Sequence, residues 1–243
     1  MGTIVDYTML LKKPRAGEIE EKIGRASNRN IDKTGVFYHV ITKSQNGDNI
    51  FLAKGAGEYR HNLLCRLCEE RGITILFSVT MPNHTHDVLL SYDWETISEV
   101  YKILNTNTSK FIRAANPGKY PKGLKIIRRH PAYIVIRDVI YLFVLGKYIF
   151  DNPEYLRKDG RFVPYDCFWM FRTEHFNNAY DERIYKALFS LSAKELYNIY
   201  ESMDMKAVRQ YAMAHLSHWT KTMTQSIFFK QPEPKITAIS PHT

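Results

Sequence analysis

Two strands and the turn between them are predicted for residues 73–90, which read ITILFSVTMPNHTHDVLL. Residues 73–80 are mostly β-branched, aliphatic or aromatic, which is typical of a buried strand. Pro82 and Asn83 favour a turn, so we expect the chain to reverse there and to return as a strand over residues 84–90. The pattern therefore predicts an antiparallel pair of strands.

A pair of histidines begins the second of these strands. Because side chains alternate along a strand, His84 and His86 share one face, whereas Thr85 and Asp87 point the other way. Two neighbouring imidazoles suit a divalent metal ion when further ligands, usually oxygens, complete the shell. A His-x-His pattern is more often a surface pair than a ligand set. Its position directly after a turn favours the metal site here.

The segments on either side of this hairpin indicate an α+β fold. A strand is predicted over residues 36–42 and a helix over residues 57–71. A second helix is predicted over residues 95–115, and residues 133–150 read as the end of a strand followed by a buried helix over 136–150. The order strand, helix, strand, strand, helix predicts an antiparallel sheet with helices packed on one face.

The chain becomes helical in character beyond about residue 181. Apolar residues at three- and four-residue spacing predict helices over residues 193–203, 205–219 and 223–229. They form either a compact appendage of helix-turn-helix type or helices packed against the main domain. The predicted divisions of the chain are a lead-in over residues 1–34, a main domain over 35–175, a helical extension over 176–230 and a disordered tail over 231–243.

Positive charge is concentrated in the middle of the chain. The net charge is +9, which favours a polyanionic partner. Residues 100–137 contain no Asp or Glu, and Tyr101, Phe111 and Tyr120 are interleaved with their Lys and Arg residues. This mixture is typical of a groove that follows phosphates and stacks bases, although a solvated basic face is the simpler alternative. The predicted DNA-binding residues are Lys102, Lys110, Arg113, Lys119, Lys122, Lys125, Arg128 and Arg129.

Cysteines and apolar segments give no sign of export or membrane insertion. Cys65, Cys68 and Cys167 form no disulfide pattern, which suits a reducing cytosol. Cys65 and Cys68 lie in an apolar helical pattern, so a buried helix face is favoured over a zinc site. No signal peptide is expected, and the apolar residues 133–150 contain three charged side chains, which disfavours a membrane span.

A tyrosine and an amide occur at the end of the helix predicted over residues 136–150. Tyr148 and Asn152 stand four residues apart, so on a helix they lie on one face, one turn from each other. Most of the sixteen tyrosines are expected to be structural. Spacing alone therefore assigns no role to Tyr148.

Four motifs together resemble the single-tyrosine HUH transposases of the IS200-like superfamily, and in particular their REP-associated branch. Residues 81–86, MPNHTH, resemble the family's Met-Pro-Asn-His-hydrophobic-His motif. Residues 148–153, YIFDNP, resemble its Tyr-Ile-x-x-Asn-Pro signature. Residues 38–43, YHVITK, resemble its opening strand, and residues 136–138 its arginine-acid turn before the tyrosine helix. The resemblance spans residues 35–171.

The resemblance implies a ferredoxin-like sheet with a metal site and a nucleophile. Tyr148 would be the catalytic nucleophile, and His84, His86 and Asn152 would bind a divalent ion, Mg or Mn. The implied substrate is single-stranded or hairpin DNA, cleaved through a 5′-phosphotyrosine and rejoined by strand transfer. The family also implies a monomer rather than a homodimer with shared sites, acting on DNA in a bacterial cytoplasm.

Three alternatives compete with this reading. Thr85 and Asp87 stand where the family has apolar residues, so one alternative is a catalytically inactive, domesticated binder of single-stranded or hairpin DNA. A second is a metal-dependent phosphodiesterase that uses water as its nucleophile. The third, a relaxase, is disfavoured by the Tyr-Ile-x-x-Asn-Pro motif.

Overall fold

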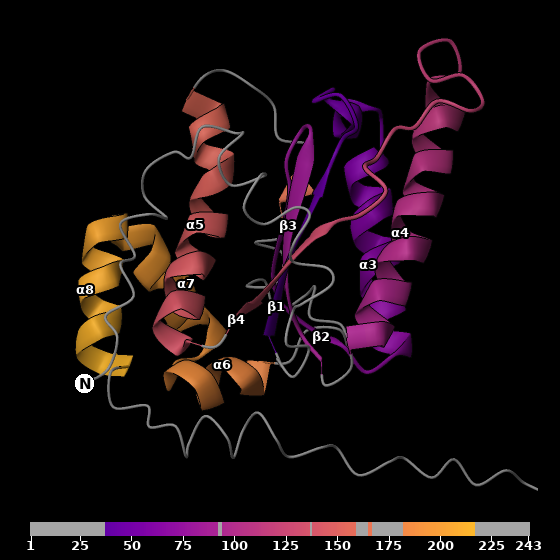
Figure 1. Cartoon of the computed structure of the whole chain (residues 1–243). Helices are drawn as coiled ribbons and strands as arrows, with labels where there is room; N and C mark the ends of the chain where they lie inside the picture. Colours follow the sequence, from indigo (N-terminus) through magenta and orange to yellow (C-terminus); the bar gives the residue numbers. More distant parts are fainter. Residues whose placement is uncertain (1–36, 92–93, 137, 159–164, 167–181, 217–243) are drawn as a thin grey trace, which may run out of the picture.

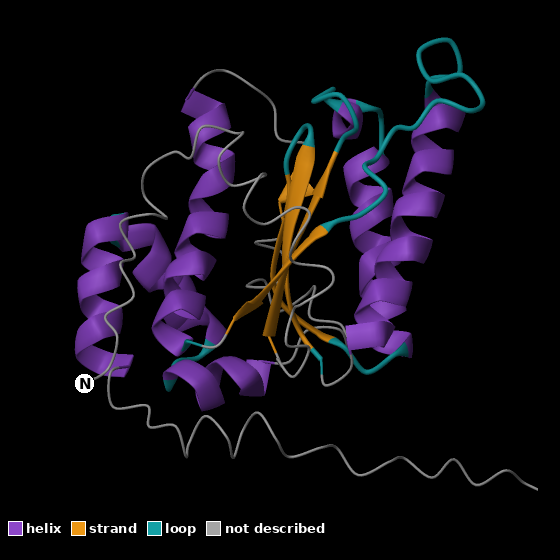
Figure 2. Cartoon of the chain, in the orientation of Figure 1, coloured by secondary structure: helices purple, strands orange, loops and turns teal. Residues whose placement is uncertain are grey.

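Five strands form one antiparallel sheet in the order β4-β1-β3-β2-β5 (Figures 1 and 2). The computed structural model describes residues 37–91, 94–136, 138–158, 165–166 and 182–216. The strands are β1 (Phe37–Lys43), β2 (Thr74–Thr80), β3 (His84–Leu90), β4 (Ala132–Ile136) and β5 (Tyr165–Asp166).

The first four strands and their connections have the ferredoxin-like order. After the short helix η2 (Ile50–Leu52), α3 (Ala56–Glu70) connects β1 to β2, and α4 (Trp94–Ala115) connects β3 to β4. The helix α5 (Val139–Lys158) follows β4. The elements follow the order strand, helix, strand, strand, helix, strand, and the strands pair antiparallel in the order 4-1-3-2. This arrangement confirms the predicted α+β, ferredoxin-like class.

Helices cover both faces of this sheet (Figure 1). On β3, Asp87 bonds to Arg60 of α3 and to Tyr101 of α4, whereas the ring of its neighbour His86 lies against Tyr148 of α5. The expectation of helices on one face holds for α3 and α4, but α5 lies on the opposite face. The reason is that β2 and β3 are buried along nearly their whole length, so both of their faces need cover.

Asp138 sets the beginning of α5. Its carboxylate oxygen Oδ1 accepts hydrogen bonds from the backbone N–H groups of Ile140 and Tyr141, at 2.7 and 3.1 Å. These contacts satisfy amides that have no partner within the first turn of a helix. The helix therefore begins at Val139, three residues later than predicted, and Ile136 ends the strand before it.

Three further helices pack against α5 and the sheet. Tyr185 donates a hydrogen bond to the backbone carbonyl of Leu76 in β2, and Tyr200 donates one to the carbonyl of Phe143 in α5, at 2.5 and 2.7 Å. Helices are present where residues 193–203 and 205–219 were predicted to be helical, and a further one, over residues 182–189, was not predicted; all three share one apolar core with the sheet. They are α6 (Glu182–Phe189), α7 (Ala193–Ser202) and α8 (Met205–Leu216).

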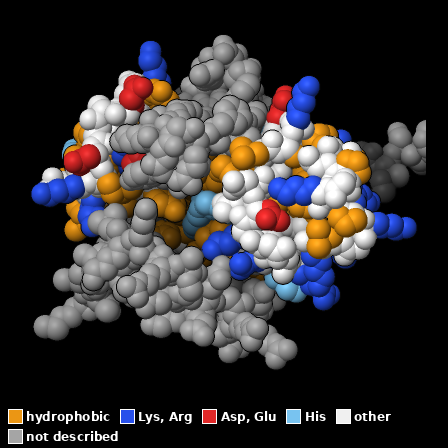
Figure 3. Space-filling view, turned by 90° about the horizontal axis from the view of Figure 1, so that it is seen from above, with side chains coloured by type: hydrophobic (Ala, Val, Ile, Leu, Met, Phe, Trp, Pro, Cys, Tyr) orange, Lys and Arg blue, Asp and Glu red, His pale blue; other side chains and the backbone are white. Residues whose placement is uncertain are grey.

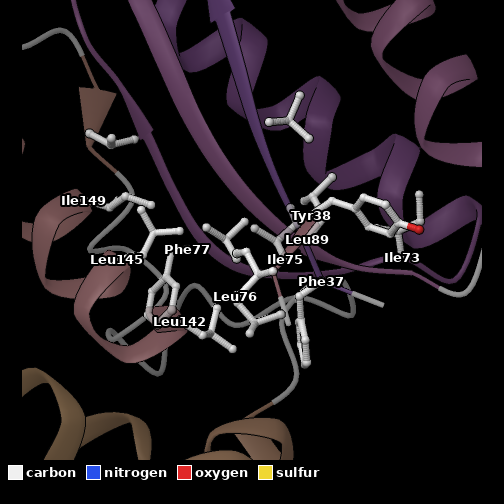
Figure 4. Packing of buried hydrophobic residues seen from close by; sticks show 14 of the residues in the cluster. Phe37, Tyr38, Ile73, Ile75, Leu76, Phe77, Leu89, Leu142, Leu145 and Ile149 are labelled. Carbon is white, nitrogen blue, oxygen red and sulfur yellow. The ribbon is translucent and has the colours of Figure 1, made fainter. Parts of the chain in front are cut away.

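The apolar core lies between the sheet and its helical layers. Figure 4 shows Phe77 of β2 packed among Leu142 and Leu145 of α5. On the other side, Cys65 and Cys68 of α3 are buried, as predicted. Within the part of the chain that the structure describes, no helix is long and apolar enough to cross a membrane.

Some predicted segments lie outside the described residues. These are the lead-in over residues 1–34, Cys167, the helix over 223–229 and the tail over 231–243. The helix predicted over residues 205–219 is described as far as Leu216.

Candidate metal and nucleophile site

Two histidines of β3 lie side by side on the face of the sheet that α5 covers. The ring centroids of His84 and His86 are 5.0 Å apart and the rings are nearly perpendicular, at 86°. Alternation along the strand places both rings on this face and Asp87 on the other. Seen from above, histidine side chains lie near the middle of the molecule, next to Lys and Arg side chains (Figure 3).

Asn83 orients His84. The side-chain oxygen Oδ1 of Asn83 lies 2.7 Å from Nδ1 of His84, while its nitrogen Nδ2 donates to the carbonyl of Gly47 at 3.4 Å. Because the amide nitrogen is used on Gly47, the amide oxygen faces the histidine and can only accept. Nδ1 of His84 therefore carries the proton, and its Nε2 keeps a lone pair for another partner.

His86 is oriented by a third histidine, which sequence reasoning left out of the site. Nε2 of His39 in β1 lies 2.9 Å from Nδ1 of His86, and the two rings stack with centroids 5.1 Å apart. Both side chains are buried. His39 lies in the Tyr-His-Val motif, but its nearness to His86 follows only from the register of β1 and β3, in which Ile41 stands opposite His86.

α5 brings Tyr148 to His86 and carries Asn152 one turn further along the helix. The ring of Tyr148 meets the ring of His86 edge to face, with centroids 5.5 Å apart, and the tyrosine is 37% exposed. Asn152, one turn later, is buried, and its Nδ2 donates to the backbone carbonyl of Tyr148 at 3.0 Å. Its amide oxygen is therefore left to accept or to coordinate.

The site holds its histidines neutral. Burial lowers the pKa of His84 to about 4, and the ammonium of Lys43, its cross-strand partner, adds to this shift. Burial also lowers the pKa of His86 well below its ordinary value, with His39, His84 and Lys43 adding to the effect. At neutral pH both imidazoles are thus in the form that binds metal ions.

The donor set fits a divalent cation only with help from other oxygens. Among the described residues, no three His, Cys, Asp or Glu side chains are grouped to hold a metal. The structure brings together the imidazoles of His84 and His86, and Asn152 lies one turn beyond Tyr148 on α5. Nε2 of His86 is buried and has no hydrogen-bond partner among the described residues, as expected of a ligand atom. Mg or Mn would take its remaining ligands from phosphate oxygens and water.

The basic loop between α4 and β4 is fastened beside this site. The backbone of Gln45, just after β1, bonds to the carbonyl of Ile126 at 2.8 Å, and the backbone of Arg128 bonds to the carbonyl of Lys43 at 3.0 Å. Arg113 donates from its guanidinium to the carbonyl of Leu124 at 2.8 Å, so it supports the loop.

The remaining basic side chains predicted to bind DNA are exposed, but they do not form one group. Lys102 lies thirteen residues before the end of α4, which is roughly 20 Å along the helix axis. Lys110 lies near the end of the same helix, and the others follow it in the loop. The exposed set is Lys102, Lys110, Lys119, Lys122, Lys125, Arg128 and Arg129.

Behind the histidines, Asp87 is the centre of a buried polar cluster. Arg60 of α3 binds both of its carboxylate oxygens, at 2.5 and 3.3 Å, and Tyr101 of α4 and Ser78 of β2 each donate to it at 2.7 Å. All four side chains are fully buried. This cluster joins the histidine strand to both helices on the opposite face.

Comparison with known proteins gives structural likenesses only. No protein-family model and no curated protein matches this sequence. One similar solved structure is that of a REP-associated tyrosine transposase bound to a REP hairpin, with 16% identity and a TM-score of 0.41 over 63% of this chain and 88% of that chain. Another is a putative transposase from Deinococcus radiodurans, with 17% identity and a TM-score of 0.36 over 48% and 90% of the two chains.

Proposed function

We propose that this protein is a metal-dependent tyrosine DNA transposase that cleaves and rejoins single-stranded or hairpin DNA. The observation that carries the proposal is the contact of the Tyr148 ring with the ring of His86, because it brings a tyrosine nucleophile to a pair of imidazole donors. Asn152, one turn further along α5, is the proposed oxygen donor. Residues 81–86 and 148–153 resemble two motifs of the tyrosine transposases, and this resemblance indicates which reaction the site would catalyse.

The proposed reaction exchanges one phosphodiester for another. Oη of Tyr148 attacks the scissile phosphorus and loses its proton, the bond from phosphorus to the 3′ oxygen breaks, and that oxygen leaves as a hydroxyl after taking a proton. The DNA is then attached by its 5′ phosphate to the tyrosine. A 3′-hydroxyl of another strand reverses the attack, so strand transfer needs no further energy source.

The tyrosine needs assistance, because the ordinary pKa of a tyrosine is about 10. A divalent cation held by His84, His86 and Asn152 would polarise the scissile phosphate and stabilise charge on the leaving oxygen. Lys43 adds a positive charge next to His84, where a phosphate would lie. Tyr148 is 37% exposed, which favours its access to a DNA strand.

The basic loop is the proposed grip on the DNA. Its backbone is bonded to the end of β1 at Lys43 and Gln45, so Arg128 follows directly on the positive charge of Lys43, and the other exposed Lys and Arg side chains lie further along the loop. The proposed catalytic unit spans residues 35–175. We propose that it acts as a monomer, because α5 is packed against its own C-terminal helices.

Replacement of Tyr148 tests the nucleophile directly. Tyr148→Phe should abolish an SDS-resistant covalent adduct with 5′- and 3′-labelled single-stranded and hairpin oligonucleotides in Mg²⁺ or Mn²⁺, while DNA affinity stays within about twofold. Tyr141→Phe is the matched control, since Tyr141 lies on the same helix and near enough to Tyr148 for their charges to interact. It should form the adduct.

Two outcomes would replace the proposal. If Tyr148→Phe still cleaves DNA in the presence of metal, water is the nucleophile and the protein is a phosphodiesterase. If the unaltered chain binds hairpin DNA tightly but forms no adduct with any oligonucleotide, the protein is a non-cleaving DNA-binding protein.

A further inference from the structure

His39 is buried against the metal site although it is not in the proposed ligand set. Its Nε2 lies 2.9 Å from Nδ1 of His86, so this nitrogen is already engaged. Its other ring nitrogen, Nδ1, has no hydrogen-bond partner among the described residues. A histidine in this position is more than core packing, because apolar residues would fill the same space without the cost of burying a polar ring.

A hydrogen bond between two neutral imidazoles requires one proton between them. If Nε2 of His39 carries it, His86 holds its own proton on Nε2, the buried atom without a partner among the described residues. If Nδ1 of His86 carries it, Nε2 of His86 keeps a lone pair. Only the second arrangement leaves His86 able to bind a cation.

His84 offers a parallel within the same site. Its Nδ1 donates to the side-chain oxygen of Asn83, a group that accepts only, and its Nε2 is thereby left as a lone pair. Each histidine of the pair thus has its Nδ1 on a neighbouring side chain. Metal-binding histidines commonly use their second ring nitrogen in this way, which fixes the tautomer and the ring orientation.

We propose that His39 is a positioning residue that accepts the Nδ1 proton of His86 and so presents the Nε2 lone pair of His86 to a divalent cation. His39 itself does not coordinate the cation, because its Nε2 faces His86. The inference rests on the metal site of the proposed function. It adds that the tautomer of His86 is set before any metal binds.

The tautomer of His86 is the first measurement. In the metal-free, ¹⁵N-labelled full chain, long-range ¹H–¹⁵N spectra should show His86 with its proton on Nδ1. In His39→Leu this preference should be lost, and the Nε2–H form should appear. A metal-free wild-type chain with the proton of His86 on Nε2 would overturn the proposal without reference to any variant.

Affinity for Mn²⁺ alone, measured by isothermal titration calorimetry, is the second measurement. His39→Leu should weaken binding about 10- to 100-fold, the usual effect of losing such an outer partner. His39→Gln, whose side-chain oxygen can accept the proton, should stay within about fivefold of the wild type. His61→Leu is the matched control, because His61 is also buried but lies on α3 on the opposite side of the sheet. It should bind Mn²⁺ normally.

The outcomes separate this inference from the proposed function. Normal Mn²⁺ affinity in His39→Leu, or equal losses in His39→Leu and His39→Gln, would mean that His39 only fills space. If His39→Leu does not fold, the tautomer of His86 in the wild type and the Mn²⁺ affinity of His39→Gln decide whether His39 positions His86. If the chain shows the expected tautomer and affinities but forms no DNA adduct, the proposed role of His39 is supported and the proposed transposase reaction is refuted.

Discussion

Asp87 is a charged residue whose contribution lies in the fold rather than in the reaction. It stands next to His86 in sequence but faces α3 and α4, where Arg60, Tyr101 and Ser78 satisfy its carboxylate. A buried ion pair of this kind adds little net stability compared with apolar residues, but loss of one partner is costly. Its four contacts fix how β3 lies on the helices, and thereby where the histidines project.

Removal of this charge alone should be strongly destabilising. Asp87→Asn leaves the buried guanidinium of Arg60 without its counter-charge, and we expect a loss of about 3–5 kcal/mol in the free energy of unfolding, measured in urea. The double variant Arg60→Met with Asp87→Leu removes both charges and should lose less than the single variant. A loss below about 1 kcal/mol for Asp87→Asn would contradict the account of a closed charge pair.

The site shows which residues a sequence can reveal. The shared face of His84 and His86 follows from alternation within one strand, and the shared face of Tyr148 and Asn152 from the period of one helix. His39 could not be found in this way, because its contact with His86 depends on the register between two strands that are 47 residues apart at these positions. Local patterns carry no information on that register.

Among the elements, α5 approaches the sheet unusually closely. A Cβ atom at Gly146 would lie 2.7 Å from Cζ of Phe77 in β2 and would also collide with the hydroxyl of Tyr200 in α7. Lys147, the next residue, is buried and binds Asp151 at 2.6 Å and the carbonyl of Tyr200 at 2.7 Å. These two residues hold the helix that carries Tyr148 between β2 and α7.

Gly146→Ala should therefore separate α5 from its neighbours. Alanine favours a helix over glycine by about 1 kcal/mol, but overpacking costs about 1–3 kcal/mol, so we expect a net loss of stability of up to 2 kcal/mol. The yield of covalent adduct should also fall, because Tyr148 moves with its helix. Gly118→Ala is the control, since a Cβ atom there meets nothing within 4 Å. Unchanged stability and adduct yield in Gly146→Ala would refute the close packing.

The elements themselves were largely predictable, but their layering was not. Apolar periodicity predicts the hairpin, α3, α4 and the beginning of α5 within a few residues, because each pattern is local. The predicted end of α5 at residue 150 is wrong, since the helix continues through Pro153 to Lys158. Apolar periodicity does not indicate which face of the sheet a helix covers. That choice depends on the close fit at Gly146 and on the polar contacts of Lys147. In the sequence, the charge of Lys147 argues against a membrane span, but it does not predict the contact of Lys147 with α7.

At the scale of the whole molecule, charge is distributed unevenly around the site. The chain has a net charge of +9, and the loop before β4, which carries exposed Lys and Arg residues, is bonded to the end of β1 through its backbone at Ile126 and Arg128. The C-terminal helices carry both signs, with Lys194 and Lys206 exposed on them. The two regions therefore allow a matched comparison of basic side chains.

The salt dependence of DNA binding measures the contribution of this loop to DNA affinity. Lys119→Ala, Lys122→Ala and Lys125→Ala combined should weaken hairpin binding and lower the slope of log affinity against log salt by about 2, since each lost phosphate contact removes roughly 0.7–0.9. Lys194→Ala with Lys206→Ala should leave the slope unchanged. Fluorescence anisotropy at several salt concentrations gives both values, and equal slopes in all three proteins would exclude the loop from the DNA interface.

The attachment of this loop has a consequence for how the protein can evolve. The bonds from Gln45 to Ile126 and from Arg128 to Lys43 are made by backbone atoms, which every residue other than proline provides in the same way. The exposed side chains along the loop can therefore change without loosening it from the sheet, whereas its buried residues Tyr120, Ile126 and Ile127 cannot, and the histidines and Tyr148 stay where they are. Under the proposed function, selection for a new DNA target would act on the exposed side chains of the loop, while the site on β3 and α5 stays unchanged.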